Sequence, residues 1–329
     1  MATSNAGATP GRGPFAELAI ALAWGAWSEL GISGWTETHG DWAIDPEPLI
    51  VFTALLDDGD PRLRDEATDW CIRNWRYVSK ARLKNTVRSW PRFDREAFGE
   101  FAATVGEHAG ITWPGSTEPR PYTPTGRSVL PPLDRPSLVW LRLRAMFGLG
   151  ARTEILRYFL AGPPMRAGVA EIAAVTGYTK RNIAEESDQL KRAGVLDVRQ
   201  NGNRYSYGLA RRSELEAFVG EFPPLRPDWN ALLRVASELV ALERQVATSS
   251  PRTLPVKVRA ALTRIEGDLH TLDVLVPSAG IVGASLWPAV ESLASATLGE
   301  WSIGHWPNGG PGRLSLSATL AEMRDAERY

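Results

Sequence analysis

The sequence predicts a mainly α-helical protein with one small β-hairpin near its middle. Apolar residues recur at helical spacing through most of residues 15–110 and again after residue 229. Two of the predicted helices open with Asp-Pro, at Asp45-Pro46 and Asp60-Pro61, which is typical of an N-cap followed by a first-turn proline. Only the stretch "VLDVRQNGNRYSYGL" has the composition of two paired strands, with Asn-Gly at the turn.

The chain divides into five expected segments. A disordered lead (1–14) precedes an N-terminal helical domain (15–113), whose helices follow "PFAELAIALAWGAWSEL", "DPEPLIVFTALLDD", "DPRLRDEATDWCIRNW", "SKARLKNTVRSW" and "DREAFGEFAATVGEHAG". Seven prolines mark 114–136 as a semi-rigid linker. A central domain (137–222) and a C-terminal helical region (223–329) complete the chain.

Composition bounds the class of protein. The 329 residues are 43% hydrophobic and 23% charged, and no apolar run approaches the ~20 residues of a membrane helix, so we expect no membrane contact. The start "MATSNAGATPGRGP" has no apolar core after a basic residue and does not predict a signal peptide. The single cysteine, Cys71, excludes an intrachain disulfide and predicts a buried structural thiol, which fits a cytoplasmic protein.

Charge is distributed unevenly along the chain. Between Arg135 and Glu214 there are 14 Lys and Arg against 7 Asp and Glu, whereas the remainder is net acidic. A basic middle between acidic flanks indicates that the middle meets a polyanion. The alternative is chance clustering on a solvated face.

Tryptophan is concentrated in the N-terminal domain, where eight of the thirteen lie before residue 114. Packing in a core or an interface is the commoner use of Trp, and base stacking is the alternative. An interface would make this Trp-rich domain the surface that holds a protein partner.

The central segment "GVAEIAAVTGYTKRNIAEESDQLKRAGVLDVRQNGNRYSYGL" predicts two short helices, a tight turn at Gly177, an N-cap at Thr179 and a hairpin. Over about residues 150–210 this pattern resembles the winged helix-turn-helix transcription regulators of the ArsR and MarR type. The resemblance implies a central winged helix-turn-helix domain with a small β-wing and binding of double-stranded DNA. It also implies a homodimer, because such modules read paired half-sites.

The second helix of the motif is the expected DNA reader. With Ile183 and Leu190 turned inward, steps of 100° per residue place Arg181, Glu185, Asp188 and Arg192 outward, as two pairs four residues apart. Glu185, Glu186 and Asp188 depart from the polar or basic residues that the resemblance implies. Ser187 stands where an apolar residue is usual. The candidate DNA-binding residues are Thr179, Lys180, Arg181, Asn182, Glu185, Gln189 and Arg192 on the helix, and Arg199, Asn203 and Arg204 on the hairpin.

These residue types match the groups that DNA presents. Thr179 and the first amides of the helix meet a phosphate, Arg181 reaches guanine and Asn182 reads adenine. Glu185 accepts from a cytosine amino group or positions Arg181. The hairpin cations meet the backbone or the minor groove.

The C-terminal region has two amphipathic helices with apolar stripes that need a partner surface, within the chain or across a two-fold axis. They are Leu232, Val235 and Leu239, and Val258, Leu262 and Ile265. We expect a homodimer, the commonest oligomer.

No catalytic chemistry can be read from the sequence. The four histidines are dispersed and one cysteine gives no zinc spacing, so we expect no metal, no cofactor and no enzymatic activity. "GHWPNGGPGR" precedes no Lys-Ser/Thr helix start and is expected to be a loop. The functions left open are a DNA-binding transcription regulator and, as the alternative, a protein-interaction module such as an antitoxin-like partner of a toxin.

Overall fold

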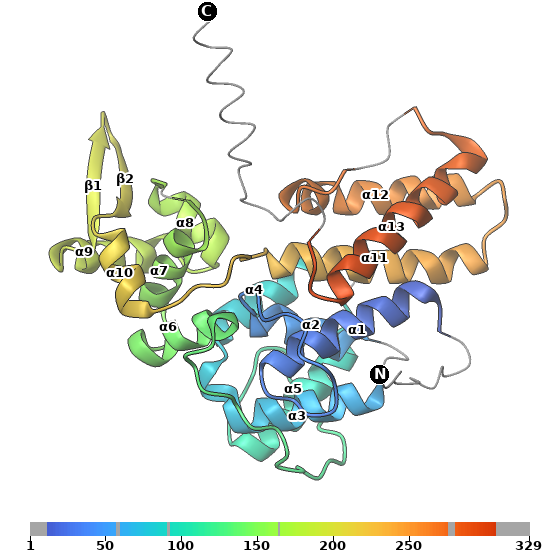
Figure 1. Ribbon diagram of the computed structural model, residues 1–329, viewed down its shortest axis with the longest axis horizontal. Coiled ribbons are helices and arrows are strands. Elements are labelled where there is room, and N and C mark those ends of the chain that lie inside the picture. The colour runs from blue at the N-terminus through green and yellow to red at the C-terminus, as the bar shows by residue number, and fades with distance from the viewer. Residues whose placement is uncertain (1–11, 57–59, 91–92, 164, 276–279, 307–329) are drawn as a thin grey trace, which may run out of the picture. The chain divides into compact units, whose positions relative to one another are not determined.

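The computed structural model describes residues 12–56, 60–90, 93–163, 165–275 and 280–306. Within these ranges the protein is mainly helical, with one two-stranded antiparallel sheet, as the sequence predicts (Figure 1). The expected lead up to residue 11 and the loop from residue 307 lie outside the described residues.

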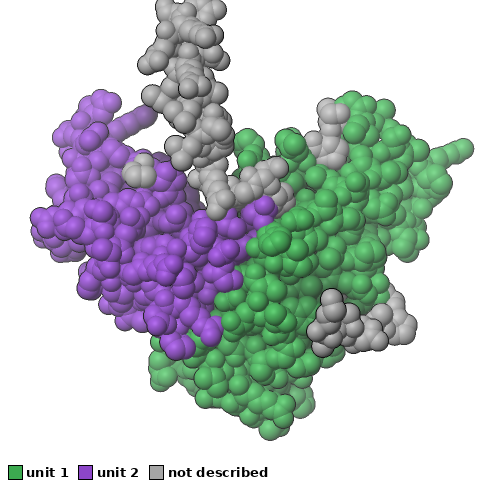
Figure 2. Space-filling view, viewed as in Figure 1, with its two compact units in different colours: residues 1–39, 45–131, 228–305 green, residues 40–44, 132–227, 306–329 purple. Residues whose placement is uncertain are grey.

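The chain forms two compact units, which Figure 2 colours separately. Unit 1 comprises residues 1–39, 45–131 and 228–305, and unit 2 comprises 40–44, 132–227 and 306–329. The sequence predicts separate N-terminal and C-terminal helical regions, whereas the structure groups their helices in unit 1.

Unit 1 contains eight α-helices among its described residues. They are α1 (Pro14–Glu29), α2 (Pro46–Leu55), α3 (Pro61–Asn74), α4 (Lys80–Ser89), α5 (Arg95–Ala109), α11 (Trp229–Ala247), α12 (Leu254–Thr271) and α13 (Leu286–Ser302), with 3-10 turns at Trp75–Tyr77 and Gly283–Ser285. α1 packs against α2, α11 and α13, so that N-terminal and C-terminal helices share a core.

The tryptophans of the N-terminal region are mostly core residues. Six of the eight before residue 114 are buried. Trp27 meets Trp70 edge-on, with ring centroids 5.4 Å apart, and its indole N–H donates to Thr53 Oγ1. Trp35, with 40% of its surface exposed, stacks on Trp24. Most of these tryptophan side chains are therefore packed in the interior and are not exposed to a partner.

Helix α1 receives its N-terminal cap from a residue far along the chain. Gly13, at its N-cap, has no side chain to accept a hydrogen bond. The carboxylate of Glu243, on α11, accepts from the backbone N–H groups of Phe15 and Ala16 at 3.1 and 3.4 Å. A Cβ on Gly13 would lie 2.2 Å from Glu243 Oε2, so glycine leaves the room that this carboxylate needs.

The first part of the predicted linker is held against unit 1. Asp69 of α3 accepts from the backbone N–H groups of Gly126 and Ser128 at 2.8 and 3.2 Å. The Tyr122 hydroxyl donates to the Asp65 carbonyl oxygen at 2.8 Å. The boundary between the units falls between Pro131 and Pro132, inside this Pro-rich segment.

The apolar stripes of the C-terminal helices are covered within the chain. α11 and α12 pack against each other, and all six stripe residues are at most 5% exposed. Val235, Leu239, Leu262 and Ile265 face one small cavity together with Val290 of α13. Of the two alternatives, the covering surface is therefore the one within the chain. These stripes provide no surface for a two-fold partner, and the homodimer stays a prediction. Cys71 is fully buried, as expected, and burial raises the pKa of its thiol.

Unit 2 contains α6 (Val139–Phe147), α7 (Ala151–Ala161), α8 (Val169–Thr176), α9 (Lys180–Arg192), β1 (Leu196–Asn201), β2 (Arg204–Leu209) and α10 (Arg212–Val219), after a 3-10 turn at Pro136–Leu138. Helices α7, α8 and α9 pack together, and β1 follows α9 directly. Residue Ala167, just before α8, forms an antiparallel bridge with Tyr207 of β2. The hydrophobic core of unit 2 includes Ile155, Phe159, Ile172 and Leu190.

Candidate nucleic-acid interface

Helix α9 begins where its sequence predicts. Gly177 closes α8 with φ of 74°, the left-handed conformation that glycine adopts without strain. Thr179 is extended, and its Oγ1 accepts from the backbone N–H of Asn182 at 3.2 Å. That hydroxyl also donates to Asn182 Oδ1 at 2.9 Å, which occupies one of the two groups needed for a bidentate contact to adenine.

The inward and outward faces of α9 are those the sequence predicts. Ile183, Ser187 and Leu190 are buried. The predicted outer positions Arg181, Glu185, Asp188 and Arg192 are exposed, as are Lys180, Asn182 and Gln189. The Ser187 hydroxyl is buried with no hydrogen-bond partner among the described residues.

The acidic residues of α9 have three different environments. Glu185 accepts from Arg181 Nε at 2.8 Å, with the side chains 61% and 86% exposed, and this hydrogen bond raises the pKa of Arg181. Glu186 turns toward α7, where it accepts from Arg152 Nε at 3.0 Å. Glu186 is thus paired with a cation and is not an uncompensated charge on the outer face of α9.

Asp188 is not in the expected pair with Arg192. No ion pair between them occurs among the described residues, although the i,i+4 spacing permits one. Asp188 lies near Tyr207, whose pKa is raised by burial and then by this carboxylate.

The hairpin turns at a two-residue loop. Asn201 pairs with Arg204 and leaves Gly202 and Asn203 at the turn. Gly202 has φ of 57°, while Asn203 has no positive φ. Glycine at the first loop position is typical of a type II′ turn, so the glycine sets this turn and not the preceding asparagine.

Alternation along the strands separates the hairpin side chains into two faces. Val198 and Tyr207 are paired across the strands on the face that joins the core. Arg199 and Arg204 lie on the opposite face, where Arg199 is paired with Ser206 and Arg204 with Asn201. Arg166 holds this face by donating to both Asp197 carboxylate oxygens at 2.8 Å and to the Ser206 carbonyl oxygen at 2.8 Å.

Within residues 151–214, the cations without a carboxylate partner lie on α9 and the hairpin. In residues 151–214, six arginines lie within 4.0 Å of a carboxylate oxygen: Arg152, Arg157, Arg166, Arg181, Arg211 and Arg212. The other five cations are exposed and have no ion pair among the described residues: Lys180, Lys191, Arg192, Arg199 and Arg204. Of the residues predicted from the sequence, Arg192, Arg199, Arg204 and Lys180 belong to this set, and Arg181 does not. Lys191 was missed, although its charge and its place in the last turn were visible in the sequence.

Comparison with known proteins finds no match, whether with protein-family models, curated proteins or solved structures. Within the described residues, no three or more His, Cys, Asp and Glu side chains gather where a metal ion would fit. The helices that the structure describes include none of the length and apolarity required to cross a bilayer.

Proposed function

We propose that this protein binds double-stranded DNA through α9 and the β1–β2 hairpin, in the manner of a winged helix-turn-helix regulator. The observation that carries the proposal is that these two elements bring together five exposed cations that have no ion pair among the described residues. DNA affinity arises largely from such groups, because each phosphate that a cation neutralises releases condensed counterions.

The geometry of α9 supports the proposal independently of charge. Its N-terminal turn is capped and solvent-exposed, so the first amides and Thr179 can approach a phosphate. Gln189 is exposed on the same helix and provides both amide groups for base edges, whereas Asn182 provides its NH2 group while its Oδ1 accepts from Thr179. Arg152 pairs with Glu186 and so neutralises one negative charge on the helix that would face the phosphates.

A direct test measures the binding of the full chain to a fluorescently labelled random duplex by anisotropy over a series of salt concentrations. A triple variant in which Gln replaces Lys191, Arg192 and Arg204 is expected to bind more weakly at low salt. Its slope of log affinity against log salt should be smaller in magnitude by about 3. The control is Arg211→Gln, which removes an exposed cation already paired with Glu214. Equal losses in the two proteins, or no binding by the wild type, would overturn the proposal.

The alternative function, protein interaction through the same helix, is favoured by one observation. Arg181, the predicted guanine reader, is occupied by Glu185, and Asp188 adds an exposed carboxylate beside it. An outer face of α9 that carries both acidic and basic side chains is complementary to a protein surface that also carries both. Absence of duplex binding in the salt series would favour this alternative.

A further inference from the structure

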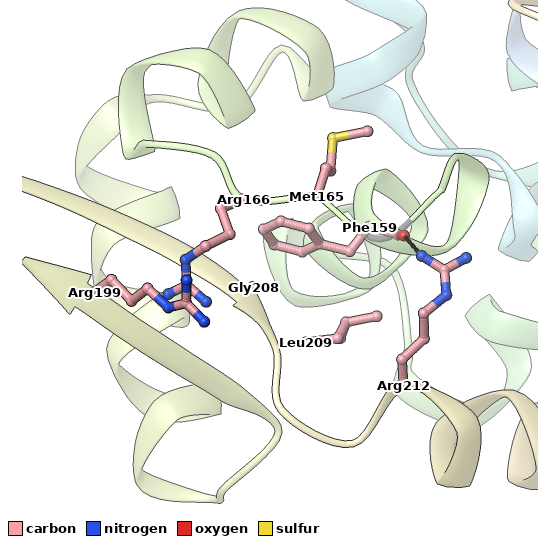
Figure 3. A pocket seen from close by; sticks show the side chains of 7 residues that line it. All are labelled: Phe159, Met165, Arg166, Arg199, Gly208, Leu209 and Arg212. Atoms are coloured by element: carbon pink, nitrogen blue, oxygen red, sulfur yellow. Dashed lines mark hydrogen bonds between the residues drawn. The ribbon is translucent and has the colours of Figure 1, made fainter. Parts of the chain in front are cut away.

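Unit 2 has a pocket on the face of the hairpin that carries Arg199. Its volume is about 390 Å³, within the range of small-molecule sites. Phe159, Met165, Arg166, Arg199, Gly208, Leu209 and Arg212 line it. Figure 3 shows Arg166 and Arg199 at one end and Arg212 at the other, with Phe159 and Met165 between them.

Two of the three arginines in the pocket use their guanidinium groups in hydrogen bonds to other residues of the protein. Arg166 donates to Asp197 and to the Ser206 carbonyl oxygen. Arg212 donates to Glu216 Oε1 at 2.7 Å and to the carbonyl oxygens of Phe159 and Gly162 at 2.8 and 2.7 Å. Each of these guanidinium groups is therefore neutralised by one carboxylate and forms part of the wall.

Arg199 is the arginine of the pocket lining whose charge is not balanced by a carboxylate. Its side chain is exposed and has no ion pair among the described residues. With Asp197 and Glu216 balancing Arg166 and Arg212, the lining has a net charge of one positive unit, and Arg199 carries it. The pocket is thus matched to a single negative charge.

The remaining lining is apolar and accommodates the body of a ligand. The Phe159 ring, the Met165 side chain and Leu209 supply it. Gly208 leaves room for the ion pair in the wall, because a Cβ there would lie 3.0 Å from Arg166 Nη1 and 3.2 Å from Asp197 Oδ1. An apolar wall with one cation at its edge selects a molecule with a hydrocarbon body and one anionic end.

We propose that this pocket binds a monoanionic carboxylic acid with an apolar body, and that the carboxylate draws Arg199 away from the DNA backbone. The second half rests on the proposed DNA-binding function, since Arg199 is one of the five cations that would meet phosphates. A guanidinium paired with a carboxylate in the pocket no longer releases a counterion from DNA. Ligand binding and DNA binding then compete for one side chain.

The test uses the full chain with 13C-methyl methionine and hexanoate as the probe. The chain has four methionines, and of the two that the structure describes, Met146 and Met165, Met165 lines the pocket. Hexanoate is expected to shift the Met165 methyl resonance in a saturable way. Acetate, which lacks the apolar body, and hexanamide, which lacks the charge, should produce at most weak shifts. Absence of saturation by hexanoate, or equal binding of hexanamide, would overturn the site.

Two variants distinguish the pocket from general attraction of anions. Arg199→Gln should raise the dissociation constant for hexanoate by about tenfold, because it removes a charge-assisted hydrogen bond. Arg204→Gln removes the same charge from the same face of the hairpin but lies outside the lining, and should leave that constant within about twofold. An equal effect of both variants would refute a specific site.

Coupling is tested by anisotropy with labelled duplex in hexanoate, with acetate at the same concentration as the ionic-strength control. Hexanoate should weaken wild-type binding by no more than Arg199→Gln does, and should not weaken binding by Arg199→Gln further. If the wild type binds hexanoate but no duplex, the proposed DNA function fails and the pocket stands. If it binds duplex and hexanoate without competition, the coupling is refuted.

Discussion

Glu185 restrains the proposed interface by occupying Arg181, and its removal should have a measurable effect. The five unpaired cations predict a slope of log affinity against log salt of up to about −4.5, at roughly −0.9 for each phosphate contacted. Between 50 and 200 mM salt this corresponds to a loss of affinity of up to about 500-fold. Glu185→Gln leaves Arg181 as a sixth cation, because a neutral amide does not hold the guanidinium by charge. The slope should then steepen to about −5.4.

The assay is anisotropy of a labelled random duplex over a salt series, with Glu214→Gln as the matched control. Glu214 also pairs with an exposed arginine, Arg211 at 3.5 Å, and its loss changes the net charge equally. The control tests position on the surface, because Arg211 lies outside α9 and the hairpin. An unchanged slope for Glu185→Gln, or an equal change for Glu214→Gln, would refute the assignment of Arg181 to the interface.

Three further predictions address α9 and the core of unit 1. Arg152→Gln should weaken duplex binding at low salt without altering unfolding by more than about 1 kcal/mol, because it returns the Glu186 charge to the surface; unchanged binding in the same anisotropy assay would contradict this. Ser187→Ala should raise the free energy of unfolding of unit 2 by about 1 kcal/mol in urea titrations followed by circular dichroism, since it removes a buried hydroxyl with no partner among the described residues. His39 is fully buried, its Nε2 lies 2.8 Å from the Trp301 carbonyl oxygen, and burial lowers its pKa to about 4. The unfolded chain therefore takes up a proton below pH ~6.5 that the folded chain does not, and unfolding should become easier by about 3 kcal/mol as pH falls from 6.5 to 4. Tryptophan fluorescence in urea would measure this loss, which His39→Gln should remove; the same pH dependence in that variant would assign it to other groups.

Local sequence signals gave the outline of α9 because its determinants are local. A cap at Thr179 and a left-handed Gly177 act within one turn of the residues they affect. The outward face followed from helical periodicity alone. The charge state of that face did not, because Arg152 and Glu186 are 34 residues apart and meet only through the packing of α7 on α9.

Predictions that depend on long-range packing could not be made from periodicity. The stripes on α11 and α12 indicated that a covering surface exists but not whether it belongs to the same chain. The proline in "GIVGASLWPAVESLASATLGEW" predicts a helix broken near Pro288, because proline disrupts a helix interior. The structure corrects this, since proline fits a first turn. It lies near the start of α13, which continues to Ser302. The pocket gathers Phe159, Met165, Arg199 and Arg212 from four separate places, and no spacing in the sequence relates them.

The capping of α1 by Glu243 has a consequence for the order in which the protein can assemble during synthesis. Residues Pro14–Ala109 leave the ribosome long before α11 and α13, which complete their core. Most of unit 2, residues 132–227, lies in the sequence between the two parts of unit 1. Its helices and hairpin can therefore fold before unit 1 is complete. Until residue 243 emerges, the first amides of α1 lack this carboxylate, and the apolar faces that α11 and α13 later cover remain in contact with water. Truncation before α11 should therefore yield a chain whose first helices lack a folding partner.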